Sequence, residues 1–448
     1  MSASVHVVSM KSWTLEPRYC NGSRKKFQYK LYVRIVYVHL RSTTPKNLLY
    51  APGLDRWSLY KSIWQRQWKG FCELYPERLE PEYGSLPVKK KAEVAKLLRC
   101  GNFNNGFRKH TCPDCGTVLV VPFTCKSRLC LSCYRKKLYG WSINLSQIMD
   151  TSFTHVHVTF TVPGMVTKKL FEKGFKAEEM IPRAATVYWK AIRRNAGSLD
   201  SQWRVGIIAT VHRCGNGLNY NPHVHLIGTR DLVNTETGEI AFPGLINYRR
   251  VRFEWMNALC ALMRTQRIAT RAVIQEIKRE YPNGFHVYFQ PITGESNDVL
   301  FRTAEYLAAG YFHNSQVVAV DHHKKTVTFR FKSWVDRNTK EKSYSTVTMD
   351  IYEFMARMLY YLPDRHRKMI RYYGLYAHKI GEKLKIIDRK TWAAAIENSF
   401  NKNPELCPDC GSTMRPSLVF SFFVEEEMKK LWRSHVLYKG YFRMKRGP

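Results

Sequence analysis

The sequence lacks any run of about 18 consecutive uncharged apolar residues, which excludes a membrane-spanning helix of ordinary length. Its N-terminus also lacks the basic start, apolar stretch and small-residue cleavage site of a secretory signal peptide. No internal repeat of about 20–50 residues is present, so a solenoid or a propeller is not indicated. We therefore expect a soluble protein of the cytoplasm.

Acidic residues are scarce. The 448 residues include 36 Asp and Glu against 72 Lys and Arg, a formal net charge of +36 at pH 7. A surplus of this size indicates a polyanionic partner such as nucleic acid. Disorder does not explain the composition, because 44% hydrophobic and 13% aromatic residues are enough to form buried cores.

Hydrophobic patterning divides the chain into four regions. We expect a basic arm at 1–50, a helical DNA-recognition domain with a metal site at 51–149, a larger mixed domain at 150–380 and a basic C-terminal region at 381–448. Helical spacing occurs at 57–98, where the proline-containing stretch 75–87 should separate short helices, and at 134–149, 177–195, 250–280, 299–310 and 351–362. Strand-like alternation occurs at 154–161 and from 326, and further strands are expected at 204–211, 223–228 and 285–290. Short strands interleaved with helices predict an α+β fold.

The cysteines indicate metal binding rather than a disulfide scaffold, because cytoplasmic thiols stay reduced. Six of the 12 cysteines lie within residues 100–133. Two C-x-x-C pairs separated by fourteen residues have the spacing of a zinc ribbon, in which each pair places two thiolates on one turn. We therefore predict one structural Zn²⁺ held by Cys112, Cys115, Cys130 and Cys133.

Other residues could extend this site or be separate from it. Cys100, Cys125 and His110 are either further ligands or ordinary buried or surface residues. Cys407 and Cys410 repeat half of the pattern and need two more ligands, so a metal site and a reduced pair are both open. Seven basic residues flank the predicted ligands and favour contact with phosphate: Arg108, Lys109, Lys126, Arg128, Arg135, Lys136 and Lys137.

His223 and His225 indicate a second kind of metal site. They flank one apolar residue on a predicted strand, so both imidazoles point to the same face and could share one divalent ion. A core or surface pair is the alternative, and His155 and His157 show the same H-x-H pattern. Only the later pair follows a turn rich in Gly and Asn. An ion held by imidazoles can polarise a phosphoryl oxygen.

The order of several motifs resembles the HUH-type rolling-circle transposases of bacterial insertion sequences, which are related to Helitrons. The cysteine-rich basic module precedes the H-x-H strand, and a strand ending in Gln290-Pro291 precedes a Y-L-A motif that begins at Tyr306. Further matches are His313-Asn314-Ser315, Val327–Lys332 and Ile370–Ala377. The resemblance covers about residues 57–415.

This resemblance implies an HUH-endonuclease domain at 150–380, with a central antiparallel sheet flanked by helices. His223 and His225 would bind a catalytic Mg²⁺ or Mn²⁺, and a tyrosine would attack a phosphodiester to form a 5′-phosphotyrosine link. Tyr306 best matches the nucleophile because it opens the Y-L-A motif. Tyr311 is the second candidate, although five residues correspond to about 140° of helical rotation, whereas two-tyrosine members have four-residue spacing.

The expected partner is DNA, as single-stranded or hairpin element ends in the bacterial nucleoid. Glu305, Asn314 and Asp231 are candidates for a third ligand of the catalytic metal. A single-tyrosine mechanism with Tyr311 in the core stays open. So do two other functions: a plasmid replication initiator or relaxase with the same chemistry, and a non-catalytic zinc-ribbon regulator, for which the charge and the cysteines suffice.

Overall fold

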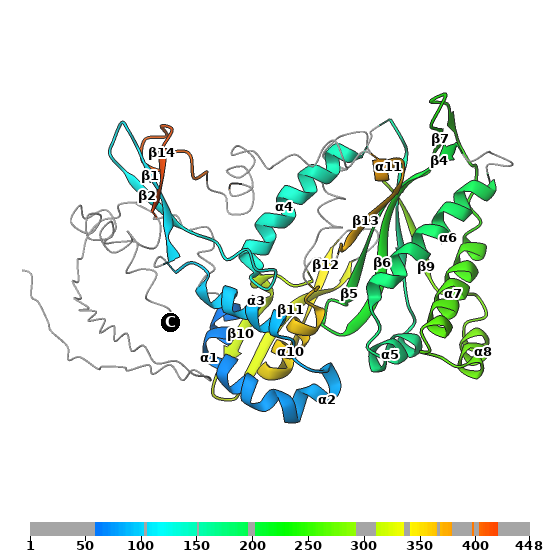
Figure 1. The fold of residues 1–448 in the computed structure, drawn as a ribbon, viewed down its shortest axis with the longest axis horizontal. Coiled ribbons are helices and arrows are strands. Elements are labelled where there is room, and N and C mark those ends of the chain that lie inside the picture. Colours follow the sequence, from blue (N-terminus) through cyan, green and yellow to red (C-terminus); the bar gives the residue numbers. More distant parts are fainter. Residues whose placement is uncertain are drawn as a thin grey trace, which may run out of the picture. The chain divides into compact units, whose positions relative to one another are not determined.

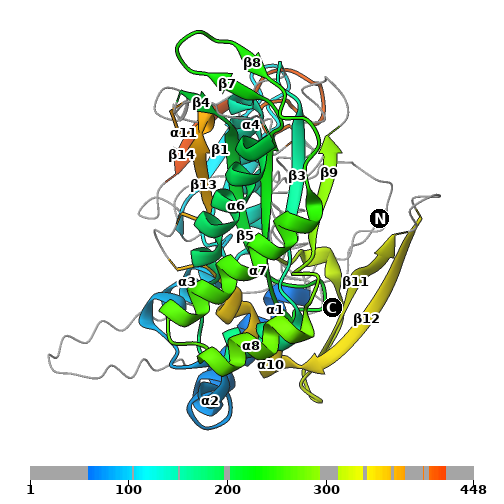
Figure 2. The same ribbon diagram turned by 90° about the vertical axis from the view of Figure 1, so that its right-hand side faces the viewer.

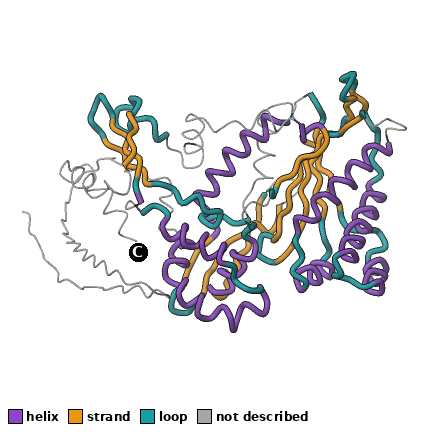
Figure 3. The backbone as a smooth tube through the Cα atoms, in the orientation of Figure 1, coloured by secondary structure: helices purple, strands orange, loops and turns teal. Residues whose placement is uncertain are grey.

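The computed structural model describes residues 59–102, 105–149, 152–195, 202–292, 311–335, 341–364, 368–378, 397 and 403–419. All of them belong to one compact unit, Leu48–Pro448. Their fold is mixed α+β with antiparallel sheets flanked by helices, which confirms the predicted class (Figure 1, Figure 3). The predicted basic arm, the helix expected at 299–310 and the basic residues after 428 lie outside the described residues.

Four consecutive helical segments begin the described chain. Tyr60, Ile63 and Trp64 recur at helical spacing and are buried, and Phe71 continues the same stripe. The proline-containing stretch expected to separate short helices is itself mostly helical, because Pro76 and Pro81 occupy first turns, where no N–H is needed. The segments are α1 (Leu59–Leu74), a π-helical turn (Tyr75–Leu79), α2 (Glu80–Tyr83) and α3 (Val88–Arg99).

A five-stranded antiparallel sheet lies at the centre of the described chain. In spatial order its strands are β13 (Ile370–Gly374), β5 (Gly206–Cys214), β6 (Tyr220–Thr229), β3 (His155–Phe160) and β9 (Val287–Ile292). The strands predicted at 154–161 and 223–228 are confirmed as β3 and β6. Because β6 is the middle strand, a residue on it has neighbours on two sides.

Helices cover both faces of this sheet (Figure 1). They include α4 (Leu131–Ile148), α5 (Gly164–Glu172), α6 (Met180–Asn195), α7 (Tyr248–Thr265) and α8 (Arg271–Glu280). Val224 and Leu226 of β6 belong to the core formed with α6 and α7, whereas Ile227 packs with α4 on the opposite face. Because strand residues alternate between faces, His223 and His225 share the α4 face.

The single long helix expected at 250–280 is two helices, α7 and α8. Arg267 adopts a positive φ of 56° after the end of α7, which turns the backbone out of the helical path. Thr270 then caps α8, because its hydroxyl accepts a hydrogen bond from the Val273 N–H at 3.4 Å.

Smaller sheets complete the fold. β10 (Val317–Asp321), β11 (Thr326–Val335) and β12 (Lys342–Asp350) form a meander that packs on α1 and α10 (Ile351–Tyr361), and Figure 2 shows β11 and β12 as a long hairpin. β1 (Phe107–Thr111) lies between β2 (Val118–Pro122) and β14 (Arg415–Val419). The rest are β4 (Trp203–Arg204), β7 (Leu232–Asn234), β8 (Ile240–Ala241) and α11 (Leu375–His378). None of the described helices is long and apolar enough to cross a membrane.

Candidate metal centres and active site

Three histidines meet on the α4 face of the central sheet. His223 and His225 lie on β6, and His212 lies directly opposite His223 on β5. The candidate ligand atoms of the three side chains are all within 4.8 Å of one another. The ring centroids of His212 and His225 are 4.4 Å apart, and those of His223 and His225 are 4.8 Å apart. The H-x-H pair therefore acquires a third imidazole from the neighbouring strand.

His212 replaces the third ligands expected from the sequence. Asp231 follows the far end of β6, where its carboxylate accepts a hydrogen bond from the Thr154 N–H at 2.7 Å. The side-chain amide of Asn314 donates to Ser132 Oγ at 2.9 Å. Neither residue joins the histidine group, and Glu305 lies outside the described residues.

Neighbouring groups orient the imidazoles. Nδ1 of His223 donates to the carbonyl oxygen of Asn221 at 2.7 Å, which leaves Nε2 of His223 unprotonated in the neutral ring. Nδ1 of His225 lies 3.0 Å from Nε2 of His157 and 3.2 Å from Oγ1 of Thr159. A metal-binding histidine is usually held in this way through its second ring nitrogen.

His157 was not predicted as a site residue, because in the sequence it is only the second histidine of the earlier H-x-H pair. The structure separates that pair. His157 supports His225, whereas His155 stacks on Tyr376, with ring planes 10° apart, and contacts its hydroxyl. The signal that could have found His157 is strand pairing, because Thr159 lies opposite His225 and His157 shares its face.

Burial favours the neutral form of His223, His225 and His157. It lowers the pKa of His223 and brings the pKa of His225 well below its usual range, where the nearby imidazoles His212, His223 and His157 act in the same direction. Burial also lowers the pKa of His157 to about 4. Neutral imidazole is the form that binds a metal, so the group fits a divalent ion. Three nitrogens suit a transition ion such as Mn²⁺ better than Mg²⁺, which prefers oxygen ligands.

His212 and His223 line a cavity of about 740 Å³. Its described lining contains no Asp or Glu, and three basic side chains, Arg213, Arg330 and Lys332, contribute to it. Arg213 is paired with the buried carboxylate of Glu178, so Arg330 and Lys332 supply most of the uncompensated charge. The cavity therefore offers an anionic ligand a positively charged path to the histidines.

Of the two candidate nucleophiles, only Tyr311 belongs to the described residues. Tyr306 lies outside the described residues. Tyr311 lines the same cavity as His212 and His223, in a bend rather than in a helix. Its hydroxyl donates to the carbonyl oxygen of Met358 at 3.1 Å, and burial raises its pKa well above the usual value. In this arrangement the Tyr311 phenol stays protonated, and it would have to break its hydrogen bond to Met358 before it could react.

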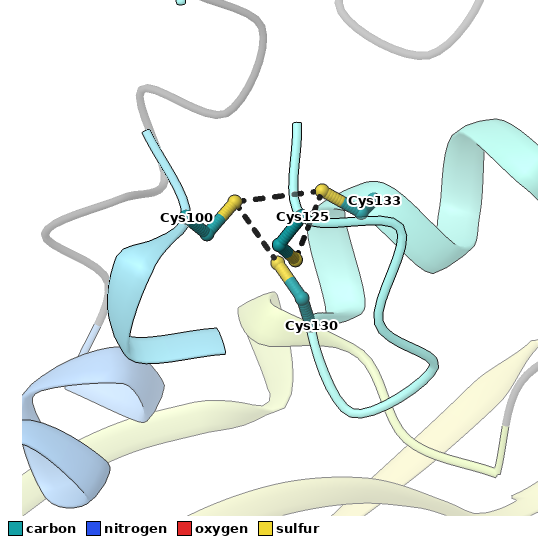
Figure 4. A group of neighbouring side chains, drawn as sticks. All are labelled: Cys100, Cys125, Cys130 and Cys133. Carbon is teal, nitrogen blue, oxygen red and sulfur yellow. Dashed lines mark hydrogen bonds between the residues drawn. The ribbon is translucent and has the colours of Figure 1, made fainter. Parts of the chain in front are cut away.

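The cysteines form two groups rather than the single site predicted. In the first group the Sγ atom of Cys100 lies 3.5 Å from that of Cys133 and 3.6 Å from that of Cys130 (Figure 4). Cys125 completes the group, 3.6 Å from Cys133. These residues come from the end of α3, the loop after β2 and the start of α4. Four sulfurs at such distances suit tetrahedral zinc.

The second group joins Cys112 and Cys115 to Cys407 and Cys410. The prediction of one site on Cys112, Cys115, Cys130 and Cys133 is therefore wrong in its pairing, although each of these cysteines belongs to a four-cysteine group. Strand pairing explains the change: β1 pairs with β14, which brings residues near 410 beside residues near 112. His110 is buried in β1 and belongs to neither group, and burial lowers its pKa to about 4.

The predicted DNA-contacting residues lie on β1, in the loop before α4 and within α4. Arg108 and Lys109 lie on β1, Lys126 and Arg128 in the loop before α4, and Arg135, Lys136 and Lys137 within α4. The guanidinium of Arg128 donates to the carbonyl oxygen of Asp364 at 3.3 Å, so one of its hydrogen-bond donors is already used within the protein. The side chain of Lys136 lies outside the described part. Contact of this set with DNA stays a prediction.

Comparisons with known proteins give two family matches. Residues 64–162 match the family described as "Transposase zinc-binding domain", and residues 206–383 match the family described as "Putative transposase". "Transposase for insertion sequence element IS801" of Pseudomonas savastanoi pv. phaseolicola is 25% identical over 364 residues, 74% of this chain and 84% of that protein. "Putative transposase y4qJ" of Sinorhizobium fredii (strain NBRC 101917 / NGR234) is 21% identical over 333 residues, 69% of this chain and 79% of that protein. No solved structure matches.

The matched regions coincide with the groups described above. The zinc-binding match contains the whole first cysteine group, and the second match contains His212, His223 and His225. Cys407 and Cys410 lie beyond both matched regions.

Proposed function

We propose that this chain, a member of the IS91/IS801 family of transposases, nicks single-stranded DNA at the ends of its element through a tyrosine and transfers the strand. The observation that carries the proposal is the group of three histidines, in which His225 is buried and the half-buried His212 and His223 line a basic cavity. A zinc-ribbon regulator without catalytic activity would need no such group. The family matches favour transposition over plasmid replication or conjugation.

The proposed reaction conserves the energy of the broken bond. A tyrosine phenolate oxygen attacks phosphorus, the new bond is a 5′-phosphotyrosine ester, and the bond to the 3′ oxygen breaks. The leaving oxygen takes up a proton and becomes a free 3′-hydroxyl. A later attack by a 3′-hydroxyl on the phosphotyrosine reverses the chemistry and releases the tyrosine, so strand transfer needs no nucleotide cofactor.

The residues of the chain have distinct roles in this proposal. His212, His223 and His225 would hold a divalent ion, which supplies Lewis-acid polarisation of the phosphate when bound. His157 and Thr159 hold the ring of His225 through its Nδ1. Basic side chains at the cavity position the strand, and the exposed ring of Tyr344 at its edge, with Arg330 5.0 Å from the ring centroid, offers a surface on which a base can stack.

Tyr306 is the proposed nucleophile, because it opens the Y-L-A motif of the family pattern. Tyr311 is the second candidate, supported by its place in the cavity with His212 and His223. The hydrogen bond from Tyr311 to Met358 and its raised pKa make Tyr311 a poor nucleophile in the arrangement described. We assign recognition of the element ends, as single strands or hairpins, to the zinc-binding domain and its basic residues.

Capture of the covalent intermediate tests the proposal. Single-stranded oligonucleotides that cover both element ends and their flanks are labelled at the 3′ end, because that fragment keeps the phosphotyrosine. With Mn²⁺ we expect a labelled protein band that survives denaturation, and mass spectrometry of the labelled peptide identifies the tyrosine. Tyr306→Phe should abolish the band, and Tyr311→Phe should reduce or spare it. An adduct that persists in the double variant contradicts the nucleophile assignment.

The histidine assignment has its own control. His223→Ala with His225→Ala should abolish the adduct while binding of single-stranded DNA remains close to that of the wild type. Loss of folding together with binding would instead mark these histidines as structural. If no adduct forms with any end sequence, the enzymatic proposal is wrong.

A further inference from the structure

We propose that Cys112, Cys115, Cys407 and Cys410 bind a second structural zinc ion, which fastens residues 403–419 to the zinc-binding domain. The four residues belong to two segments that are far apart in the sequence, since Cys112 and Cys410 are 298 positions apart. A metal at this site would close a loop that contains the entire central sheet. The proposal does not depend on the nicking activity.

The two segments are matched copies of one metal-binding turn. Cys112–Thr117 reads C-P-D-C-G-T, and Cys407–Ser412 reads C-P-D-C-G-S. Each turn is closed by two backbone hydrogen bonds. The first cysteine N–H donates to the sixth residue's carbonyl at 2.8 Å in both copies, and the glycine N–H donates back to the first cysteine's carbonyl at 3.2 and 2.9 Å.

The glycine of each turn is required by the backbone. Gly116 has φ of 73° and Gly411 has φ of 78°, in the left-handed region where a side chain is disfavoured. Each glycine therefore lets the chain turn back immediately after its second cysteine. Two equal turns facing each other present four thiols to one point, which is the arrangement of a zinc ribbon.

The sulfur positions agree with a shared metal. The Sγ atoms of Cys112 and Cys410 are 3.5 Å apart, as are those of Cys115 and Cys407. All four sulfurs lie within 4.8 Å of one another. Tetrahedral zinc with Zn–S bonds of about 2.3 Å separates its sulfurs by about 3.8 Å, whereas a disulfide needs about 2.05 Å. The observed contacts are close to the first value.

The other contacts seen between the described residues of 403–419 and the zinc-binding domain are small in extent. The apolar side chains buried with Cys112 and Cys407 are those of Leu119, Val121 and Met414, which make a small core. Thr117 Oγ1 donates to Asp409 Oδ2 at 2.6 Å across the two turns, and both groups are exposed. β14 pairs with β1 over five residues. A core this small needs a metal or a comparable cross-link for stability.

The two cysteine groups should release metal at different rates. Cys115 and Cys410 are exposed, whereas the members of the first group are all buried or half-buried. A chelator can therefore reach the second site more easily. We expect the zinc of Cys112, Cys115, Cys407 and Cys410 to be removed first.

Metal counting on the full-length protein tests the site. Zinc released by thiol modification is measured with a colorimetric chelator for the wild type and for Cys407→Ser with Cys410→Ser. The variant should contain one zinc equivalent less. Cys112→Ser with Cys115→Ser should lose the same equivalent, and the fourfold variant should lose no more than either pair. Cys72→Ser with Cys260→Ser changes two cysteines outside both groups and should keep all the zinc.

Three outcomes would overturn the site. An unchanged zinc content in the fourfold variant means that these thiols hold no zinc. A loss of two zinc equivalents in the fourfold variant, one for each pair, means that the two pairs bind different zinc ions. Thiol titration under native conditions that finds disulfides within the group would have the same consequence.

Hydrogen exchange measured by mass spectrometry tests the fastening. Loss of the second zinc, by brief chelation or by Cys407→Ser with Cys410→Ser, should speed amide exchange in peptides covering 403–419 and 107–122. Peptides from β5 and β6 should stay protected, which separates local release from unfolding. If exchange at 403–419 is the same with and without the zinc, the metal does not fasten this segment.

Discussion

Replacing His157 by alanine tests whether the three histidines act as a metal site or only as packed side chains. Nε2 of His157 lies 3.0 Å from Nδ1 of His225, and Thr159 Oγ1 lies 3.2 Å from the same atom. A neutral hydrogen bond contributes about 1 kcal/mol, and loss of the partner of a ligating histidine costs about 10–100-fold in metal affinity or activity. Because Thr159 keeps its contact with Nδ1 of His225 in the variant, we expect the lower end of this range. The Mn²⁺ concentration for half-maximal adduct formation should rise about tenfold, which corresponds to about 1.4 kcal/mol.

The assay is covalent adduct formation across a Mn²⁺ titration at a fixed concentration of single-stranded DNA. Saturating Mn²⁺ should restore most of the rate, since His157 orients a ligand and does not touch the reacting atoms. His155→Ala is the matched control, because His155 lies two residues away on β3 but contacts Tyr376. The control should lower thermal stability and leave the Mn²⁺ midpoint unchanged. A wild-type midpoint in His157→Ala, or an equal shift in His155→Ala, would refute the reasoning.

Four further outcomes follow from the site. His212→Ala leaves two imidazoles, so adduct formation should fall and should not recover at saturating Mn²⁺. Mg²⁺ should support less adduct than Mn²⁺ at equal concentration, because nitrogen ligands suit Mg²⁺ poorly; equal rates would contradict this. Lys332→Ala should reduce the slope of log affinity against log salt by about 0.7 in filter binding of single-stranded DNA, the value for one phosphate contact. Tyr344→Ala should weaken the same binding by about 1 kcal/mol or more with an unchanged slope, as loss of a stacking surface requires.

Local elements could be predicted from the sequence because they depend on residues close together along the chain. The alternation around His155 and His157 is sufficient to identify β3, and the spacing of Tyr60, Ile63 and Trp64 is sufficient to identify α1. The break between α7 and α8 was missed for a physical reason. It is made by Arg267 in a left-handed conformation, and no Gly or Pro marks the position.

The cysteine pairing could not be obtained from spacing alone. Spacing favours joining the two C-x-x-C pairs that are near each other in sequence, but the pairing of β1 with β14 brings Cys407 and Cys410 to Cys112 and Cys115. Such contacts depend on the whole fold, because all five strands of the central sheet lie between β1 and β14 along the chain. The repeated C-P-D-C-G sequence was the available signal, since equal turns are suited to face each other.

The position of His212 depends on a bulge. Cys214 pairs with Tyr220, and a regular ladder counted from there would place His212 opposite Pro222, on the face away from His223. The structure instead pairs His212 with His223, because the two residues Asn221 and Pro222 stand opposite the single residue Arg213. A proline within a central strand is itself a sign of a bulge, since it has no N–H to donate to the ladder. Pro222 thus directly precedes His223, whose pairing the bulge shifts, and it is the residue in the sequence that indicates a bulge at this point; the register that brings His212 opposite His223 comes from the structure.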